Sequence, residues 1–138
     1  MLPVNCGSHA DYQHFVVTNF RKYYPDPDAL ARSTWDIIER FWNLDLSFTD
    51  TFMADKYSKF GPTPRTPSCM QRSYLLSIDF KVTSLTEWAA QLKMNPLYAI
   101  LSGFEPGNTP CVGTFYDFIN RLWNSDYTQF FLKEALIL

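Results

Sequence analysis

Apolar residues recur along most of the chain at the three- and four-residue spacing of an amphipathic helix. From His9 to Tyr24 this stripe includes Phe15, Val16 and Phe20, and Pro25 follows it. A second stripe begins at Pro27-Asp28 and carries Leu30, Thr34, Ile37, Ile38, Phe41 and Trp42. The pattern therefore predicts two helices in this part of the chain, the second opened by its proline and acidic residue.

The pattern is less regular from Leu46 to Phe60, where aromatic residues recur among polar ones, and it predicts a shorter helix there. Residues 61–67 read Gly-Pro-Thr-Pro-Arg-Thr-Pro. Each proline lacks a backbone donor and biases the preceding residue toward extended geometry. We interpret residues 61–67 as a linker or an extended arm.

Helix signals are sharper after this segment. A helix is expected from Cys69 to Phe80, with the following side chains inward: Met70, Tyr74, Leu75, Ile78 and, less regularly, Leu76. Ser84 and Glu87 have the spacing of a capping box, which predicts a helix over 85–94. Its inward residues would be Leu85, Trp88, Ala89 and Leu92.

Three more helices are predicted towards the C-terminus. Asn95-Pro96 is typical of a short helix that Gly103 would end, with Phe104 folded back onto it. Thr109-Pro110 would open the next helix, and the segment 127–138 has helical spacing and an apolar end. The inward residues of the helix over 110–123 are Phe115, Phe118, Ile119 and Leu122, with Trp123 beside them.

Strand-like alternation and internal repeats are absent from the sequence, so we expect an all-α, multi-helix fold. A chain of 138 residues fits one domain. We expect a single helical domain over 1–138, in which N-terminal helices (1–60), the Pro-rich linker or arm (61–67) and a second helical part (68–138) follow one another.

An ordered series of short motifs resembles the N-terminal helical domain of bacterial insertion-sequence transposases of the DDE type. The motifs are RSYLL at 72–76, SLTEWA at 84–89, NPL at 95–97, Gly103-Phe104 and TFYDFINRL at 114–122. In that family a leucine usually stands where this chain has Phe115, and small hydroxyl residues stand where it has Cys111-Val112-Gly113. The resemblance spans Arg65 to Trp123, somewhat under half of the chain.

The resemblance implies a function without chemistry in this chain. In such transposases the helical domain precedes a ribonuclease-H-like catalytic domain, which these residues do not include, and it recognises transposon ends or assembles the complex. We therefore expect a non-enzymatic module that binds double-stranded DNA at transposon ends. The alternative is a protein–protein assembly or dimerisation domain with no direct DNA contact, a homodimer formed through aromatic faces or the apolar tail.

Candidate DNA-binding residues fall into two sets. The helices over 85–94 and 110–123 could form a helix-turn-helix-like unit, whose outward Thr114, Asn120 and Arg121 would meet bases or phosphates. The stretch from residue 56 to 78 has no acidic residue and contributes the candidate phosphate ligands Lys56, Lys59, Arg65 and Arg72. The formal net charge of −2 lacks the usual basic excess of DNA-binding proteins and suits the assembly alternative better.

Other chemistry has little support. Cys6, His9, Asp11 and His14 cluster, but one cysteine without a second pair of ligands is a weak zinc signal, so we expect no metal and no cofactor. The chain has no phosphate-binding loop or protease motif. The odd number of three cysteines fits a reducing compartment, and no apolar stretch approaches membrane-spanning length, so we expect a cytoplasmic protein.

Overall fold

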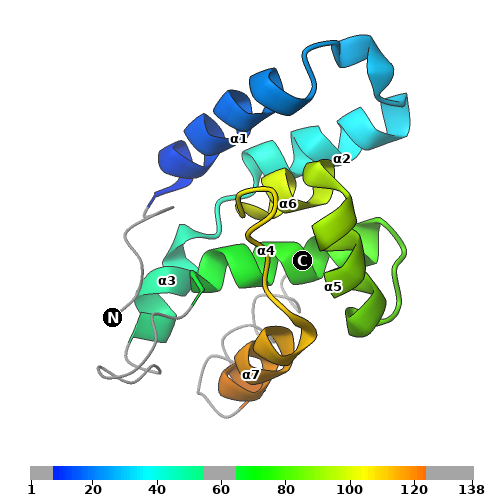
Figure 1. The fold of residues 1–138 in the computed structure, drawn as a ribbon. Coiled ribbons are helices and arrows are strands. Elements are labelled where there is room, and N and C mark those ends of the chain that lie inside the picture. The colour runs from blue at the N-terminus through cyan, green and yellow to red at the C-terminus, as the bar shows by residue number, and fades with distance from the viewer. Residues whose placement is uncertain (1–7, 55–64, 124–138) are drawn as a thin grey trace.

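The computed structural model describes residues 8–54 and 65–123, which form helices connected by loops, with no strand (Figure 1). The predicted all-α, multi-helix fold is therefore confirmed. The elements are α1 (His9–Tyr23), the 3-10 turn η1 (Pro27–Ala29), α2 (Arg32–Asn43), α3 (Ser47–Met53), α4 (Pro67–Asp79), α5 (Leu85–Met94), α6 (Pro96–Ser102) and α7 (Val112–Trp123). The predicted helix over 127–138 lies outside the described residues.

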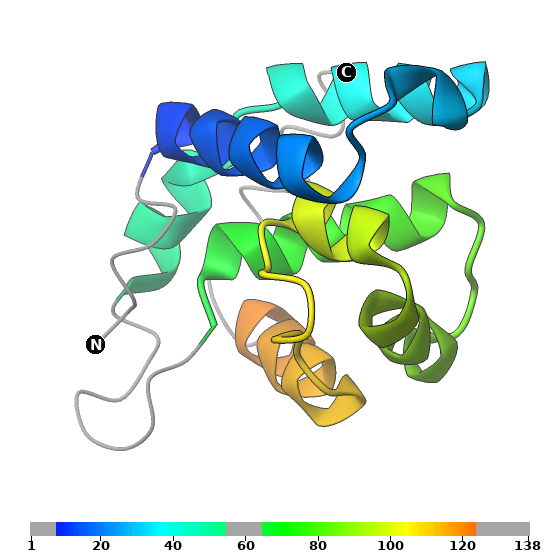
Figure 2. The same ribbon diagram turned by 45° about the horizontal axis from the view of Figure 1, so that its top comes forward.

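The helices are arranged in three layers around α4 and α6 (Figure 2). α6 packs against α1, α4 and α5, and α4 also packs against α3 and α7. α1 and α2 lie on one side of this central pair, and α5 and α7 lie on the other. The molecule therefore has two outer surfaces, one formed by each outer layer, and α4 and α6 pack between these layers.

Several helix ends follow the predicted chemistry. The Ser84 hydroxyl accepts a hydrogen bond from the Glu87 backbone N–H at 3.3 Å, and α5 begins at the next residue, Leu85. The Asn95 side chain accepts from the Leu97 N–H at 3.1 Å and caps α6. Gly103 ends α6 with φ +103°, and a Cβ there would lie 2.7 Å from the Cys69 sulfur, so this position suits glycine alone.

Two predicted helix starts were placed too early. The second helix was expected from Pro27-Asp28, but residues 27–29 form only a 3-10 turn and α2 begins at Arg32. The Asp26 carboxylate accepts from the Asp28 N–H at 3.0 Å, which stabilises the turn, and Leu30 is extended at φ −102°. The helix expected from Pro110 likewise begins at Val112.

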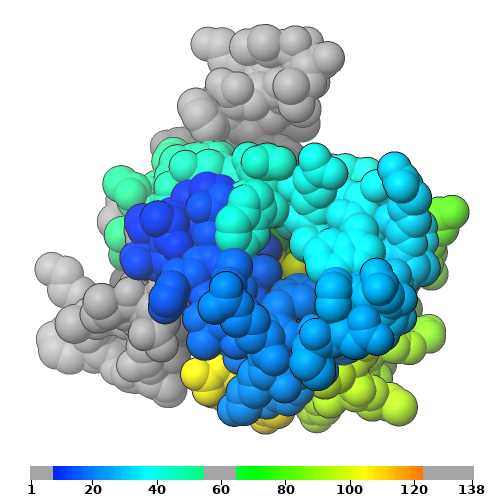
Figure 3. Space-filling view, turned by 90° about the horizontal axis from the view of Figure 1, so that it is seen from above, coloured from blue at the N-terminus to red at the C-terminus, as the bar shows by residue number. Residues whose placement is uncertain are grey.

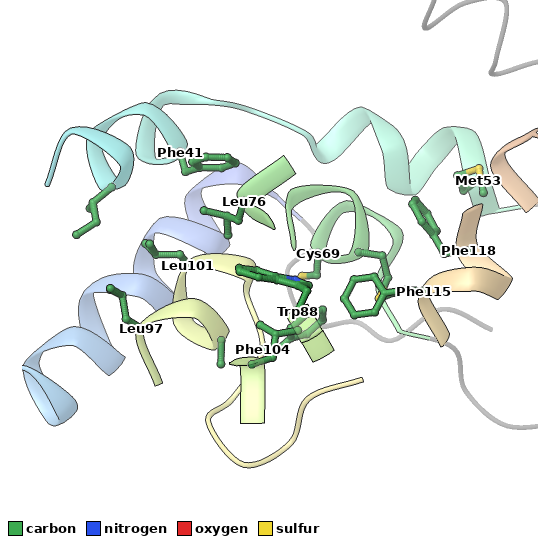
Figure 4. Packing of buried hydrophobic residues seen from close by; sticks show 14 residues of the cluster. Phe41, Met53, Cys69, Leu76, Trp88, Leu97, Leu101, Phe104, Phe115 and Phe118 are labelled. Carbon is green, nitrogen blue, oxygen red and sulfur yellow. The ribbon is translucent and has the colours of Figure 1, made fainter. Parts of the chain in front are cut away.

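The main core unites both parts of the chain, because its buried side chains run from α2 through α7 (Figure 4). Trp88 is fully buried at its centre, and its indole N–H donates to the Ser73 hydroxyl at 2.9 Å. Pro67 is the first residue of α4 and is itself buried. The C-terminal end of the predicted arm is therefore buried, while residues 61–64 lie outside the described residues.

The predicted inward face of α4 is partly wrong. Met70 and Leu76 are buried as expected, but Tyr74 and Ile78 are 40% and 58% exposed. All of the residues from Pro67 to Ser73 are buried, the polar ones included. The reason is that α4 has neighbours on several sides, so a prediction of one apolar stripe against one partner does not describe it.

Candidate nucleic-acid interface

α7 is fixed to the core by one face. Phe115 is 0% exposed and Phe118 is 3% exposed, and both belong to the main core cluster (Figure 4). The helix packs against α5 and α4. Its inward aromatic residues were predicted from their spacing, and the structure confirms their burial.

The opposite face of α7 is polar and open to solvent. Asp117, Asn120 and Arg121 are exposed, and Tyr116 is 52% exposed. Asn120 and Arg121 were predicted to face outward, and they do so. Tyr116 was not among the predicted site residues, although the helical spacing that directs Phe115 and Phe118 inward also directs Tyr116 outward.

Thr114, the third outward candidate, is half-buried at the start of α7. Its hydroxyl lies 3.4 Å from the sulfur of the exposed Cys111, and its backbone N–H donates to the Cys111 carbonyl at 3.1 Å. The hydroxyl contact lowers the pKa of the Cys111 thiol below its ordinary value. Thr114 therefore shapes the first turn of α7, and its hydroxyl already has a partner there.

Arg65 holds the loop that leads into α7. Its guanidinium donates to the Asn108 backbone carbonyl at 2.8 Å and to the Asn108 side-chain oxygen at 3.1 Å. The same group lies 5.7 Å from the centre of the Phe104 ring. Because Arg65 is only half-buried, it stays near the surface on the α7 side, but its main contacts are structural.

Arg72 was predicted to contact phosphates, and its position contradicts that role. The residue is 2% exposed, and its guanidinium lies 3.7 Å from the centre of the Tyr12 ring. One of its nitrogens donates to the Ser102 carbonyl at 3.3 Å. Arg72 lies between α1, α4 and α6, where a DNA backbone cannot reach it, because α4 is enclosed along this stretch.

Asp50 on α3 is an acidic residue that the charge of Arg72 influences. Its carboxylate accepts from the Ser68 N–H and the Ser68 hydroxyl, both at 2.8 Å, and so caps the start of α4. Burial raises the pKa of Asp50 above its ordinary value, although the Ser68 hydrogen bonds and the Arg72 charge oppose this. The Asp50 carboxylate and the Arg72 guanidinium therefore stabilise the interior of the fold, and neither lies on the exposed face of α7.

The remaining basic candidates, Lys56 and Lys59, lie outside the described residues. Of the described basic candidates, Arg72 is buried and Arg65 is hydrogen-bonded to Asn108, so these two do not form a basic surface with Arg121. The α7 face carries Asn120 and Arg121 together with the acidic Asp117, and Arg65 lies at the loop before α7. It is a polar face of mixed charge.

The predicted helix-turn-helix-like unit has a more elaborate connection than a short turn. α5 and α7 pack against each other, but α6 and the loop over 103–111 lie between them in the chain. A helix-turn-helix usually joins its two helices through three or four residues. The contact between α5 and α7 is observed, and the helix-turn-helix interpretation stays a prediction.

The described parts of the chain contain no cluster of metal-ligating side chains and no helix that could cross a membrane. No group of three or more His, Cys, Asp or Glu side chains there is placed to hold a metal ion. His9 instead lies 2.8 Å from the Trp42 carbonyl through its Nε2 atom, in a contact between α1 and the end of α2. Within residues 8–54 and 65–123, every helix is too short or too polar to cross a bilayer.

Comparison of the chain with known protein families, with curated proteins and with solved structures found no match.

Proposed function

We propose that this chain is a non-catalytic DNA-binding module of a transposase-like protein, and that α7 is the helix it presents to the duplex at transposon ends. The observation that carries the proposal is the division of α7 into two faces. Phe115 and Phe118 fix the helix in the core, while Asn120 and Arg121 face solvent. A rigidly held helix with a polar outer face is the element that most DNA readers place in the major groove.

The residue types on this face suit recognition. Asn side chains pair with adenine and Arg side chains with guanine through two hydrogen bonds each, and both also bind phosphate oxygens. Tyr116, exposed on the same helix, adds a ring and a hydroxyl that can contact the sugar-phosphate backbone. The resemblance of residues 65–123 to transposase N-terminal domains supports the same assignment.

The charge of the face sets the expected behaviour. Asp117 offsets Arg121, so few phosphates are neutralised, and binding should be weak with a shallow dependence on salt. Lys56 and Lys59 would raise both the affinity and the salt dependence if they reach the duplex. Arg65 contributes by holding the loop before α7 through Asn108.

The test is a fluorescence-anisotropy titration of the chain with pooled duplex DNA at about 50 and 200 mM salt. Asn120→Ala and Arg121→Ala should each weaken binding by roughly 5- to 160-fold, as expected for a base contact worth about 1–3 kcal/mol. Lys56→Ala with Lys59→Ala should reduce the salt slope. Lys22→Ala, an exposed cation on α1, is the control and should leave binding unchanged.

Two results would contradict the proposal. The first is an absence of binding even at the lower salt concentration. The second is binding that survives both α7 substitutions, because the duplex would then be held by another surface of the chain.

A further inference from the structure

A groove runs between α1 and α2 (Figure 3). These two helices lie on the side of the molecule away from α7 (Figure 2). The two helices lie side by side in opposite directions and are joined through η1 (Figure 1). The groove has a volume of about 760 Å³, and Phe20, Leu30, Trp35 and Trp42 contribute to its apolar lining. An open apolar surface of this kind on a small domain is typical of an interface.

Trp35 is the most prominent residue of this lining. It is 37% exposed, and its indole N–H donates to the Pro27 carbonyl at 3.1 Å. Its ring lies 6.0 Å from the ring of Phe20, centre to centre. Because the polar atom already has a partner, the exposed part is an apolar ring held in place, the kind of side chain that anchors protein interfaces.

The charged side chains around the groove are separated along its length. Arg21, Arg32 and Asp28 lie towards the η1 end, whereas Asp36 and Glu39 lie further along α2. Among the described residues, none of these five forms a salt bridge. One end therefore has an excess of positive charge, and the other end is negative.

We infer that this groove is the interface of a homodimer, in which a second copy of this chain faces it across a twofold axis. A twofold axis that lies in the plane of the interface, at right angles to the line from Arg21 to Glu39, brings each of these residues opposite the other in the second copy. The positive end of each copy then faces the negative end of the other, with Arg21 opposite Glu39, and each Trp35 enters the partner groove. The surface is thus complementary to itself in both charge and apolar lining.

This inference is independent of the proposed DNA binding. α1 and α2 lie on the opposite side of α4 and α6 from α7, so the dimer leaves both α7 faces open (Figure 2). The DNA-binding proposal and the dimer inference can therefore fail independently. Dimerisation is measured without DNA.

The experiment is sedimentation of the 138-residue chain over a concentration series, with charge reversals at two exposed groove positions. Arg21→Glu and Glu39→Arg should each weaken the dimer at least about tenfold, because two like-charged pairs then face each other. An equimolar mixture of the two variants should restore the dimer, since both pairs in the mixed species again have opposite charges. The double variant should restore it as well.

Lys22→Glu is the matched control, because it makes the same change of charge on α1 beside Arg21 but outside the groove lining. It should leave the dimer within about twofold of the unaltered chain, as expected for a charge at the rim. Trp35→Ala should weaken the dimer by at least about tenfold, as expected for an interface anchor. Thermal unfolding of each variant checks that the fold is kept, and the charge reversals decide the matter if Trp35→Ala does not fold.

Three outcomes would overturn the inference. A chain that stays monomeric up to about 1 mM has no interface of useful strength. A dimer whose dissociation constant is unchanged by both charge reversals forms through another surface. Reversals that weaken the dimer but are not rescued by mixing exclude the twofold pairing of Arg21 with Glu39.

Discussion

α4 and α7 have similar lengths and both pack against the main core, yet they use their polar residues in opposite ways. α4 contacts α3, α6 and α7, and its first seven residues are all buried. α7 contacts α4 and α5 and keeps one face in solvent. The arginine at position 72 is therefore buried and has a structural role, whereas the arginine at position 121 is exposed. The difference arises from the number of neighbours around each helix.

Three of the enclosed polar side chains of α4 have side-chain hydrogen-bond partners on other helices. Gln71 is bonded to Thr49, Ser73 accepts from the Trp88 indole, and Ser68 donates to Asp50. Buried polar groups need such partners, since an unsatisfied one costs about 1–3 kcal/mol. On α7 the polar side chains of Asp117, Asn120 and Arg121 are instead exposed at the surface.

The largest effect on stability is expected from substitutions on the buried face of α7, compared with substitutions on its exposed face. Phe115→Ala should lower the free energy of unfolding by about 3–5 kcal/mol, because it removes a fully buried ring and leaves a cavity. Tyr116→Ala, at the adjacent exposed position, should change it by less than about 0.5 kcal/mol. Urea denaturation followed by tryptophan fluorescence measures both. Equal losses from the two substitutions would mean that α7 is not held by one face.

The second prediction concerns the buried Arg72. Arg72→Ala should lower the free energy of unfolding by about 2–4 kcal/mol, because it empties the space against Tyr12 and removes the bond to Ser102. Arg72→Met should recover most of this loss. The thioether fills the space, and the substitution removes a cation whose buried Nε has no hydrogen-bond partner among the described residues.

The matched substitution for this comparison is Arg121→Met on α7, which should change the free energy of unfolding by less than about 0.5 kcal/mol. Chemical denaturation of the three variants gives the values. If Arg72→Met were as damaging as Arg72→Ala, the polar contacts of the guanidinium would matter more than the space it fills. If Arg72→Ala were harmless, the side chain would not be enclosed as described.

Local signals in the sequence predicted much of this fold, because they act over a few residues. The Ser84 cap, the Asn95-Pro96 start and Gly103 each act through a backbone group nearby, and α5 and α6 have the predicted bounds. The first helix was also predicted correctly to within one residue. What these signals could not give was the set of neighbours around each helix.

The errors at α4 share that cause. Tyr74 and Ile78 continue an apolar stripe, but the side of α4 that carries them is not the one that its neighbours cover. Arg72 stands in a stretch without acidic residues, which suggested a phosphate-binding surface, whereas α1 and α6 enclose it. For the candidate site, the outward direction of Asn120 and Arg121 followed from helical spacing, but the structural role of Arg65 required knowledge of where Asn108 lies.

The smallest expected effect is on the pH dependence of stability, to which two carboxylates at helix starts contribute with opposite signs. Burial raises the pKa of Asp50 above its ordinary value of 3.8, so the folded chain holds the proton more tightly than the unfolded chain. Its contribution to stability is therefore greatest below 3.8 and is lost as the pH rises through the folded pKa. Hydrogen bonds from Ser47 lower the pKa of Asp45, so its contribution is present above 3.8 and is lost as the pH falls through the folded pKa.

Asp50→Asn and Asp45→Asn separate these two contributions. As the pH falls from neutral through the region around 3.8, the stability of the unaltered chain should rise relative to Asp50→Asn. Relative to Asp45→Asn it should fall. Urea denaturation at a series of pH values measures both differences. Slopes of the same sign would show that burial does not dominate at Asp50, and α4 would then be less enclosed at its start than its buried Ser68 indicates.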